Sequence, residues 1–242
     1  MKRIQKLVSM LESVESIDST DKLIHKIDRF LVEARRELES PFIQKVTDGD
    51  IVDGHYTIPD GVTEIGWGVF YKCKSLESIT IPDGVTCIGE YAFFGCSSLK
   101  SINIPDGVTE IRRYAFKGCS SLESINIPNS VISIENEAFV ECSSLKKITI
   151  PDGVTEISWY AFKGCRNLES ITIPNSVTKI GHFSFGGCKS LRSITIPDGV
   201  TKIGWYAFSG CTGLRNISLP KNVKLGGYVF DMCSTALQIE YR

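Results

Sequence analysis

A strict 23-residue period constrains this chain more than any other feature of its sequence. Proline recurs at every step from Pro59 to Pro220, and only Pro41 lies outside the series. Phenylalanine keeps the same step from Phe70 to Phe208, and cysteine keeps it from Cys73 to Cys211. A unit of this length cannot bury its own apolar face, so the period predicts repeats that stack and share one continuous core.

One unit, residues 76–96, shows how the period maps onto structure. Residues 78–81 alternate polar and apolar side chains, which is the pattern of a strand. Pro82 ends this strand because it has no N–H to donate, and an Asp-Gly turn follows. Residues 85–88 predict a second short strand, and residues 91–93 predict one turn of α- or 3₁₀-helix.

Stacking these units predicts a main sheet of nine parallel strands about 4.8 Å apart. Eight repeats and a terminal strand would occupy residues 54–242. The first unit departs from the pattern, with Asp53 at the leucine position and Tyr56 in place of isoleucine. The last strand, residues 237–241, carries a charged exterior. Both departures are typical of end units, which face water on one side.

The repeat Leu-x-x-Ile-x-Ile-Pro-x-x-Val-Thr-x-Ile-Gly-x-x-Ala-Phe-x-x-Cys closely resembles the BspA-like subfamily of leucine-rich repeats, over residues 54–242. The resemblance implies an α/β solenoid, mostly β, wound as a right-handed superhelix with the parallel main sheet on its concave side. Members are mostly surface antigens, adhesins or proteins that bind other proteins. It therefore implies a non-catalytic protein–protein interaction scaffold. A structural or self-assembling solenoid and a surface adhesin for host protein or carbohydrate are the alternatives.

Residues 1–40 carry no repeat and predict a helical hairpin. Apolar residues at helical spacing run from Ile4 to Val14 and again from Leu23 to Leu38. The hairpin would either cap the open end of the solenoid or dock a partner or second copy. Residues 41–53 would form a connector with a turn at residues 48–50.

Composition and charge narrow the partners. The formal net charge is −1, so the whole chain predicts no membrane surface and does not favour nucleic acid. The residues after Met1-Lys2-Arg3 are too polar for a signal peptide, which predicts a cytoplasmic protein as written. Charge is uneven: residues 51–162 sum to −6 and residues 163–242 to +6. A protein partner is expected, and self-association through this polarity or through the hairpin is the alternative.

The sequence offers no catalytic chemistry. Its three histidines lack partners at zinc-ligand spacing, and neither a phosphate loop nor a nucleophile elbow is present. We therefore expect no enzyme, metal or cofactor. The cysteines at the 23-residue step are expected to be reduced, buried thiols. Cys87 breaks this ladder at a position predicted to face solvent, so it should react first.

The outward rows of the main sheet are small, polar and monotonous, and they form the candidate concave face. Such rows offer hydrogen bonds but few anchors for a partner. A neighbouring row alternates in charge from Glu77 to Arg192 and is predicted to be structural. The candidate face comprises Ser78, Thr80, Ser101, Asn103, Ser124, Asn126, Lys147, Thr149, Ser170, Thr172, Ser193 and Thr195.

A second candidate surface lies in the two variable columns before each Ala-Phe pair. In repeats five to seven both columns become aromatic, and stacking would bring six rings together. Trp and Tyr are the types enriched at interface hot spots. Alternatively, the second column packs inward and the tryptophans merely cover it. The nearby Lys179, Lys202 and Arg166 would steer an acidic partner. The six residues are Trp159, Tyr160, His182, Phe183, Trp205 and Tyr206.

Overall fold

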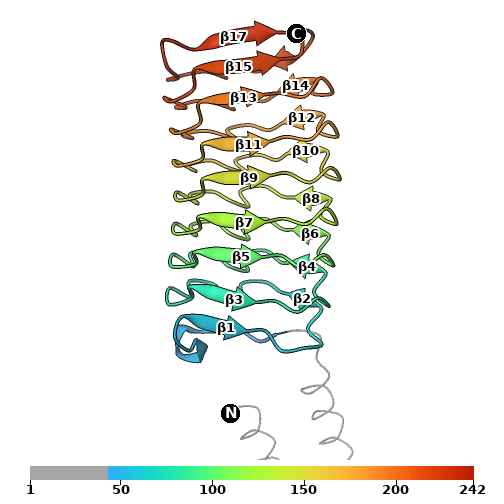
Figure 1. The fold of residues 1–242 in the computed structure, drawn as a ribbon, viewed down its shortest axis with the longest axis vertical. Coiled ribbons are helices and arrows are strands. Elements are labelled where there is room, and N and C mark those ends of the chain that lie inside the picture. Colours follow the sequence, from blue (N-terminus) through green and yellow to red (C-terminus); the bar gives the residue numbers. More distant parts are fainter. Residues whose placement is uncertain (1–42) are drawn as a thin grey trace, which may run out of the picture. The chain divides into compact units, whose positions relative to one another are not determined.

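In the computed structural model, residues 43–242 are described. They fold as a parallel β-solenoid of about eight turns in which each 23-residue repeat makes one turn and lies on the turn before it (Figure 1). The helical hairpin predicted for residues 1–40 lies outside the described residues.

The main sheet has nine strands, as the repeat predicted. Each strand pairs in parallel with at least one neighbour in a register of one repeat, so that Ile102 lies beside Ile125. Hydrogen-bonded ladders join β1–β3, β5–β7, β9–β11 and β13–β15–β17. The strands are β1 (His55–Thr57), β3 (Ser78–Thr80), β5 (Ser101–Asn103), β7 (Ser124–Asn126), β9 (Lys147–Thr149), β11 (Ser170–Thr172), β13 (Ser193–Thr195), β15 (Asn216–Leu219) and β17 (Gln238–Tyr241).

Eight two-residue strands form the second side of the coil. They pair in the orders β2-β4-β6-β8 and β10-β12-β14-β16. In each strand the second residue is isoleucine or leucine, and the first residue varies. The strands are β2 (Glu64–Ile65), β4 (Cys87–Ile88), β6 (Glu110–Ile111), β8 (Ser133–Ile134), β10 (Glu156–Ile157), β12 (Lys179–Ile180), β14 (Lys202–Ile203) and β16 (Lys224–Leu225).

Part of the predicted connector closes the first turn of the solenoid. Val46 is buried, and its N–H donates to the Val69 carbonyl at 2.8 Å. A 3₁₀ turn at Asp48–Asp50 follows, in agreement with the predicted turn. The N–H and hydroxyl of Ser75 donate to Asp48 Oδ1 at 2.8 and 2.7 Å, and these bonds lower the pKa of that carboxyl group. This segment therefore covers apolar surface that the first repeat would otherwise expose.

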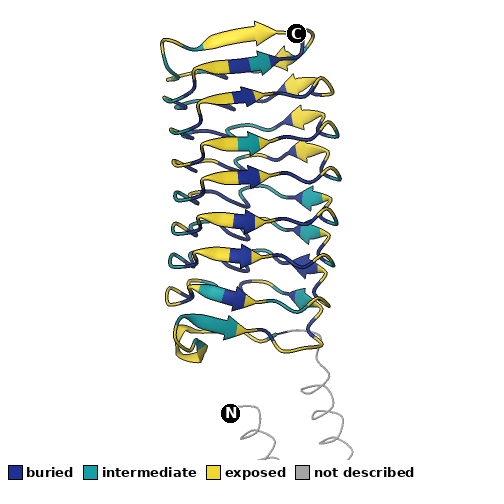
Figure 2. Cartoon of the chain, in the orientation of Figure 1, coloured by how far each residue is buried: buried dark blue, intermediate teal, exposed yellow. Residues whose placement is uncertain are grey.

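The core is a column of phenylalanine rings. From Phe70 to Phe208 every ring is fully buried and lies nearly parallel to the next, with centroids 5.0 to 5.6 Å apart. In Figure 2 the middle residue of the main strands from β3 to β13 is buried, except in β11, where it is half-buried. One ring per turn thus forms a stacked column along the solenoid.

The cysteine ladder is buried beside this column, as predicted, and all nine cysteines are free thiols. Each thiol in the ladder donates to a carbonyl of the preceding turn. Cys96 Sγ, for example, lies 3.0 Å from the Phe70 carbonyl, and Cys119 Sγ lies 3.1 Å from that of Phe93. Cysteine therefore fills a small apolar space and also satisfies a buried acceptor, which the sequence pattern alone did not reveal.

The prediction that Cys87 faces solvent is wrong, because its side chain is only 8% exposed. It lies in register between Glu64 and Glu110. Arg112 pairs with both carboxylates, at 3.9 and 3.1 Å, so that its long side chain bridges the turns on either side of the thiol. This burial raises the pKa of Cys87 to about 11, which makes it a poor first site for alkylation.

The helical turn predicted for residues 91–93 is also wrong. These residues form a turn, and among residues 43–242 the structure contains no α-helix. Tyr91 has a φ of 56°, which no right-handed helix permits. The backbone instead bonds to the next turn, with the Phe93 N–H donating to the Ala115 carbonyl at 2.8 Å. The regular elements of residues 43–242 are therefore strands and one 3₁₀ turn, so the described residues lack the α part of the predicted α/β solenoid.

Ser184 carries a polar group into the core without a partner. Its hydroxyl is fully buried and has no hydrogen-bond partner among the described residues, at a position where five other repeats have alanine. We expect Ser184→Ala to raise the free energy of unfolding by about 1–2 kcal/mol, because burying an unpaired hydroxyl is costly. Chemical denaturation would measure the change.

Ser158 provides the matched control for this substitution. It is also buried, but its hydroxyl donates to the Ile134 carbonyl at 2.6 Å. Ser158→Ala should therefore lower the free energy of unfolding by about 1 kcal/mol. Equal effects of the two substitutions would contradict this account of Ser184.

Candidate partner-binding surface

The outer face of the main sheet presents the polar rows that the sequence predicted. Strands β5, β7, β9 and β13 each show an exposed, buried, exposed pattern (Figure 2). Ser78 is half-buried, and its hydroxyl lies 2.8 Å from His55 Nδ1. Within the described residues, the large exposed apolar side chains on the strands of the main sheet are Ile239 and Tyr241, both on β17. Most of this face therefore offers a partner hydrogen bonds without an anchor.

The alternating charged row beside these strands is structural, as predicted for its first pairs. Lys100 Nζ lies 2.6 Å from Glu77, and Lys146 Nζ lies 2.8 Å from Glu123. The second pair lowers the pKa of Glu123 and raises that of Lys146 through their hydrogen bond. Because these groups are exposed, the pairs align adjacent turns but add little stability.

The second aromatic column forms a half-buried stack in the later repeats. Ring centroids of Tyr160 and Phe183 are 5.2 Å apart, those of Phe183 and Tyr206 are 4.7 Å apart, and Tyr228 follows at 5.1 Å. In the fifth repeat Lys163 Nζ lies over Tyr160 and Phe183, 5.2 and 5.5 Å from their centroids. The rings therefore form one continuous stack that is only partly accessible. They neither pack fully inward nor stand out as a fully exposed ridge, which were the two arrangements that the sequence allowed.

The two later tryptophans lie outside this stack and remain half-exposed, at 54% for Trp159 and 51% for Trp205. Each indole lies over a glycine of the next turn. A Cβ atom at Gly181 would approach Trp159 Cδ1 to 2.8 Å, and one at Gly227 would approach the Trp205 ring to 3.0 Å. At Gly181 the same Cβ atom would also come within 2.7 Å of the Trp159 backbone nitrogen, so glycine permits the close approach of the two turns, and the indole lies against it.

His182 connects the two tryptophans. Its ring meets that of Trp159 edge-on, with centroids 5.3 Å apart. Its Nδ1 accepts the Trp205 backbone N–H at 2.9 Å. All six predicted residues therefore lie on three consecutive turns of one surface. Trp205 is linked to His182 by a hydrogen bond from its backbone N–H rather than by a ring contact. We call this surface the aromatic ridge: Trp159, Tyr160, His182, Phe183, Trp205 and Tyr206.

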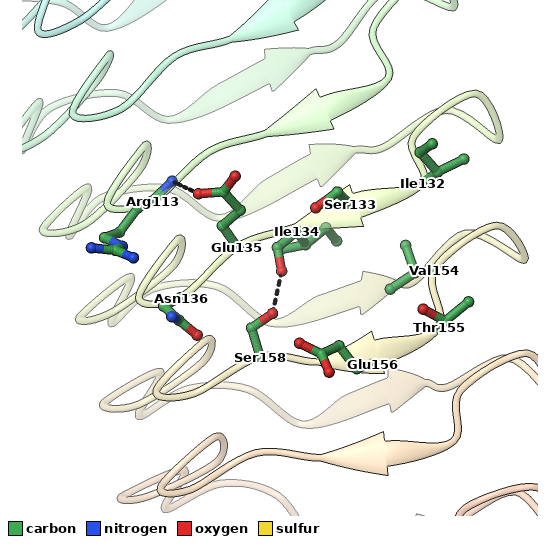
Figure 3. Close-up of a pocket in the computed structure, with 10 residues that line it drawn as sticks. All are labelled: Arg113, Ile132, Ser133, Ile134, Glu135, Asn136, Val154, Thr155, Glu156 and Ser158. Atoms are coloured by element: carbon green, nitrogen blue, oxygen red, sulfur yellow. Dashed lines mark hydrogen bonds between the residues drawn. The ribbon is translucent and has the colours of Figure 1, made fainter.

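A polar pocket of about 400 Å³ opens beside strands β8 and β10 (Figure 3). Several of its polar groups are committed to the fold. The Arg113 backbone N–H donates to Glu135 Oε2 at 3.0 Å, and Ser158 donates to the Ile134 carbonyl. Ser158 is thus held as a structural donor rather than as a nucleophile beside a base. The repeat pattern carried no signal for this pocket, whose lining includes Glu135 and Ser158 at a position where most other repeats have glycine.

A smaller groove of about 120 Å³ lies against the aromatic ridge. Its walls include Trp159, Lys179, His182 and Lys202, and Gly181 contributes to the lining. The structure thus joins the predicted steering lysines to the ridge. Arg166, the third basic residue suggested by the sequence, does not line the groove.

Two features are absent from residues 43–242. No group of three or more His, Cys, Asp or Glu side chains is arranged to hold a metal ion there. Within the same residues, no helix has the length and apolar character needed to span a membrane.

Three solved structures are similar to the chain. A leucine-rich repeat protein from Bacteroides ovatus is 32% identical, over 77% of this chain and 63% of that one, with a TM-score of 0.49. A leucine-rich cell surface protein from Faecalibacterium prausnitzii is 32% identical, with coverages of 77% and 69% and a TM-score of 0.56. The T. pallidum leucine-rich repeat protein is 32% identical, with coverages of 71% and 72% and a TM-score of 0.51.

The chain therefore spans less than two thirds of the length of the Bacteroides protein. No curated protein matches it. The profile of the BspA type leucine-rich repeat region matches residues 54–168 and 155–241, which together span more than half of the chain. The repeat that the sequence resembled is thus confirmed, and the chain belongs to the BspA-type leucine-rich-repeat family.

Proposed function

We propose that this protein is a non-catalytic interaction scaffold that binds a protein partner through the aromatic ridge. The observation that carries the proposal is two half-exposed indoles beside a continuous ring stack, on three consecutive turns. Large, rigid aromatic side chains supply much contact area for little lost side-chain entropy, and tryptophan and tyrosine dominate interface hot spots.

Neighbouring features support this choice of surface. The outer face of the main sheet presents short polar side chains over most of its length, and four charged residues beside it already pair as Glu77–Lys100 and Glu123–Lys146. The ridge is where exposed aromatic side chains coincide with a groove. A partner that inserts one apolar group beside Trp159 and His182 would exclude water from both rings.

A surface role is the second candidate. The Faecalibacterium protein, with 32% identity and a TM-score of 0.56, is described as a cell surface protein. We propose that, if this chain acts at a surface, the same ridge contacts a host protein. A glycan array tests the carbohydrate alternative, because sugar binding that survives loss of both tryptophans would exclude the ridge as its site.

The test is the double substitution Trp159→Ala and Trp205→Ala. The partners are the proteins that immobilised wild-type chain captures from the source organism and its surroundings, quantified by mass spectrometry. We expect their recovery to fall at least tenfold with the double variant, because losing one hot-spot residue costs about 2 kcal/mol or more. Circular dichroism should show an unchanged fold, since both indoles lie outside the core.

Trp67→Ala is the matched control. Trp67 is 70% exposed and occupies the same column in the first repeat, far from the ridge along the stack. It should leave recovery unchanged. Equal losses for the control and the double variant would indicate nonspecific adhesion to tryptophan, and unchanged recovery with both would show that the ridge is not the site.

A further inference from the structure

The outward positions of the second sheet change character along the solenoid. The first residues of β12, β14 and β16 are all lysine and lie directly opposite one another in register. Like charges placed directly opposite on neighbouring strands destabilise a sheet. We call Lys179, Lys202 and Lys224 the lysine column.

The same positions in the earlier repeats show how the chain neutralises such a row. There Arg112 lies within 4.0 Å of both Glu64 and Glu110 and balances their charges. No carboxylate among residues 43–242 comes within 4.0 Å of an ammonium group of the lysine column, although Glu156 is the in-register neighbour of Lys179. The lysine column is therefore a concentration of positive charge that the fold leaves uncompensated.

The groove between the lysine column and the ridge presents hydrogen-bond donors. Because His182 Nδ1 accepts the Trp205 backbone N–H, the neutral imidazole carries its proton on Nε2, which is free to donate. The indole N–H of Trp159 has no partner among the described residues. The residues that carry these donors line one groove together with Lys179 and Lys202, and donors of this kind suit acceptors such as carboxylates.

We propose that the lysine column and this groove bind an acidic segment of the protein partner, next to the aromatic ridge. This inference rests on the proposed function, since it assigns the charge of the partner that the ridge would hold. Carboxylates over Lys179, Lys202 and Lys224 would remove the repulsion between them, and the acidic segment would accept from His182 Nε2 and the indole. An apolar side chain of the same partner would then reach the rings.

Glu156 favours a polypeptide over a uniform polyanion. Glu156 lines the groove and lies in register beside Lys179, so a nucleic acid or sulfated glycan running along the strands would meet a repulsive charge at that step. A polypeptide places acidic residues opposite the lysines and a neutral or basic residue opposite Glu156. The lysine column also contains no arginine, the residue best suited to paired contacts with phosphate.

The probe is a fluorescein-labelled peptide of five consecutive glutamates with a glycine and a lysine at one end, and fluorescence anisotropy at low salt reports its binding to the full chain. We expect Lys202→Glu to weaken binding at least tenfold. The matched control is Lys146→Glu, which changes an exposed lysine already paired with Glu123 and should alter the affinity less than twofold. Equal binding by wild type and Lys202→Glu overturns the proposal.

Three further measurements keep the result unambiguous. Lys202→Glu places an acid between two lysines, so urea unfolding should show a variant at least as stable as wild type, and lower stability would overturn the claim of uncompensated charge. Glu156→Lys should strengthen binding of a heparin hexasaccharide relative to the peptide. If wild type already prefers heparin or hexathymidylate, or forms salt-sensitive oligomers that the peptide does not dissociate, the partner is not an acidic polypeptide.

The peptide assay and the capture assay test different residues, so a negative result in one does not imply a negative result in the other. The tryptophan pair should control capture of the natural partner, whereas Lys202→Glu should control peptide binding. If capture depends on the tryptophans but peptide binding is unchanged by Lys202→Glu, only the proposal for the lysine column is refuted. Capture that ignores the tryptophans would refute the ridge, and the peptide assay would then judge the acidic site by itself.

Discussion

Replacing Phe139 with alanine is expected to lower the free energy of unfolding by about 3–5 kcal/mol. Phe139 is fully buried in the middle of the phenylalanine column, with Phe116 at 5.3 Å on one side and Phe162 at 5.5 Å on the other. Both neighbours are themselves held by the next rings. The cavity that alanine leaves therefore has stiff walls and cannot collapse, so the cost should fall in the upper part of the range for large-to-small substitutions.

Guanidinium denaturation followed by circular dichroism measures this effect. Stability in a solenoid is the sum of each repeat and its contacts with its neighbours, so a central lesion weakens two interfaces. Phe230→Ala is the control in the same column: Phe230 is only partly buried and stacks on Phe208 alone, at 5.9 Å. Its cost should be less than half as large. Equal costs at both positions would show that stacking does not govern the stability of this column.

The sequence predicted the parts of the fold that depend on the period. A 23-residue step places each residue beside its equivalent in the next turn, so the register and the nine main strands follow from spacing alone. Burial of the phenylalanine and cysteine columns follows equally, because every turn presents the same apolar face. These are statements about the average repeat, and the structure confirms them.

The predictions that proved wrong concern local structure that depends on neighbouring turns rather than on the repeat itself. Tyr91 takes a positive φ because its backbone bonds to the next turn, an interaction that helix propensity does not include. Cys87 is buried because Arg112 bridges the acids on both sides of it. Val46, which helps to close the first turn, lies before the first repeat, and the 23-residue period therefore could not predict its burial.

The candidate surface was predicted only in part for the same reason. The alignment of columns was enough to place Trp159, His182 and Trp205 on consecutive turns. Each indole, however, lies close to a glycine one turn later, and the free donor of His182 depends on a hydrogen bond from the Trp205 backbone N–H. Such details arise from contacts between turns, and they decide which side chains a partner can reach.

Alkaline pH is expected to unfold the protein over a narrow interval above pH 9. Burial raises the pKa of the Cys165 thiol to about 12, and that of Cys96, Cys119, Cys142 and Cys188 also rises above the ordinary value of 9.0. All five thiols have no exposed surface. In the unfolded chain each would ionise near pH 9, whereas in the folded core it stays protonated.

The loss of stability at alkaline pH follows from this difference in thiol protonation between the folded and unfolded states. Below pH 9 both states hold the proton and these thiols make stability independent of pH. Between pH 9 and about 12 only the folded state holds it, so each thiol lowers the free energy of unfolding by about 1.4 kcal/mol per pH unit. Five thiols together give about 7 kcal/mol per pH unit. Since folded domains are stable by only about 5–15 kcal/mol, unfolding should be complete within one to two pH units.

Urea denaturation at a series of pH values, with a phosphine reductant present, measures this slope. Cys142→Ala removes one titrating thiol, together with its bond to the Phe116 carbonyl, and lowers stability at every pH. Its distinguishing effect is a slope smaller by about 1.4 kcal/mol per pH unit. Lys and Tyr ionisation is the same in both proteins and cancels in the comparison. An unchanged slope would mean that the thiols ionise within the fold, and that the cysteine ladder is not the source of alkaline unfolding.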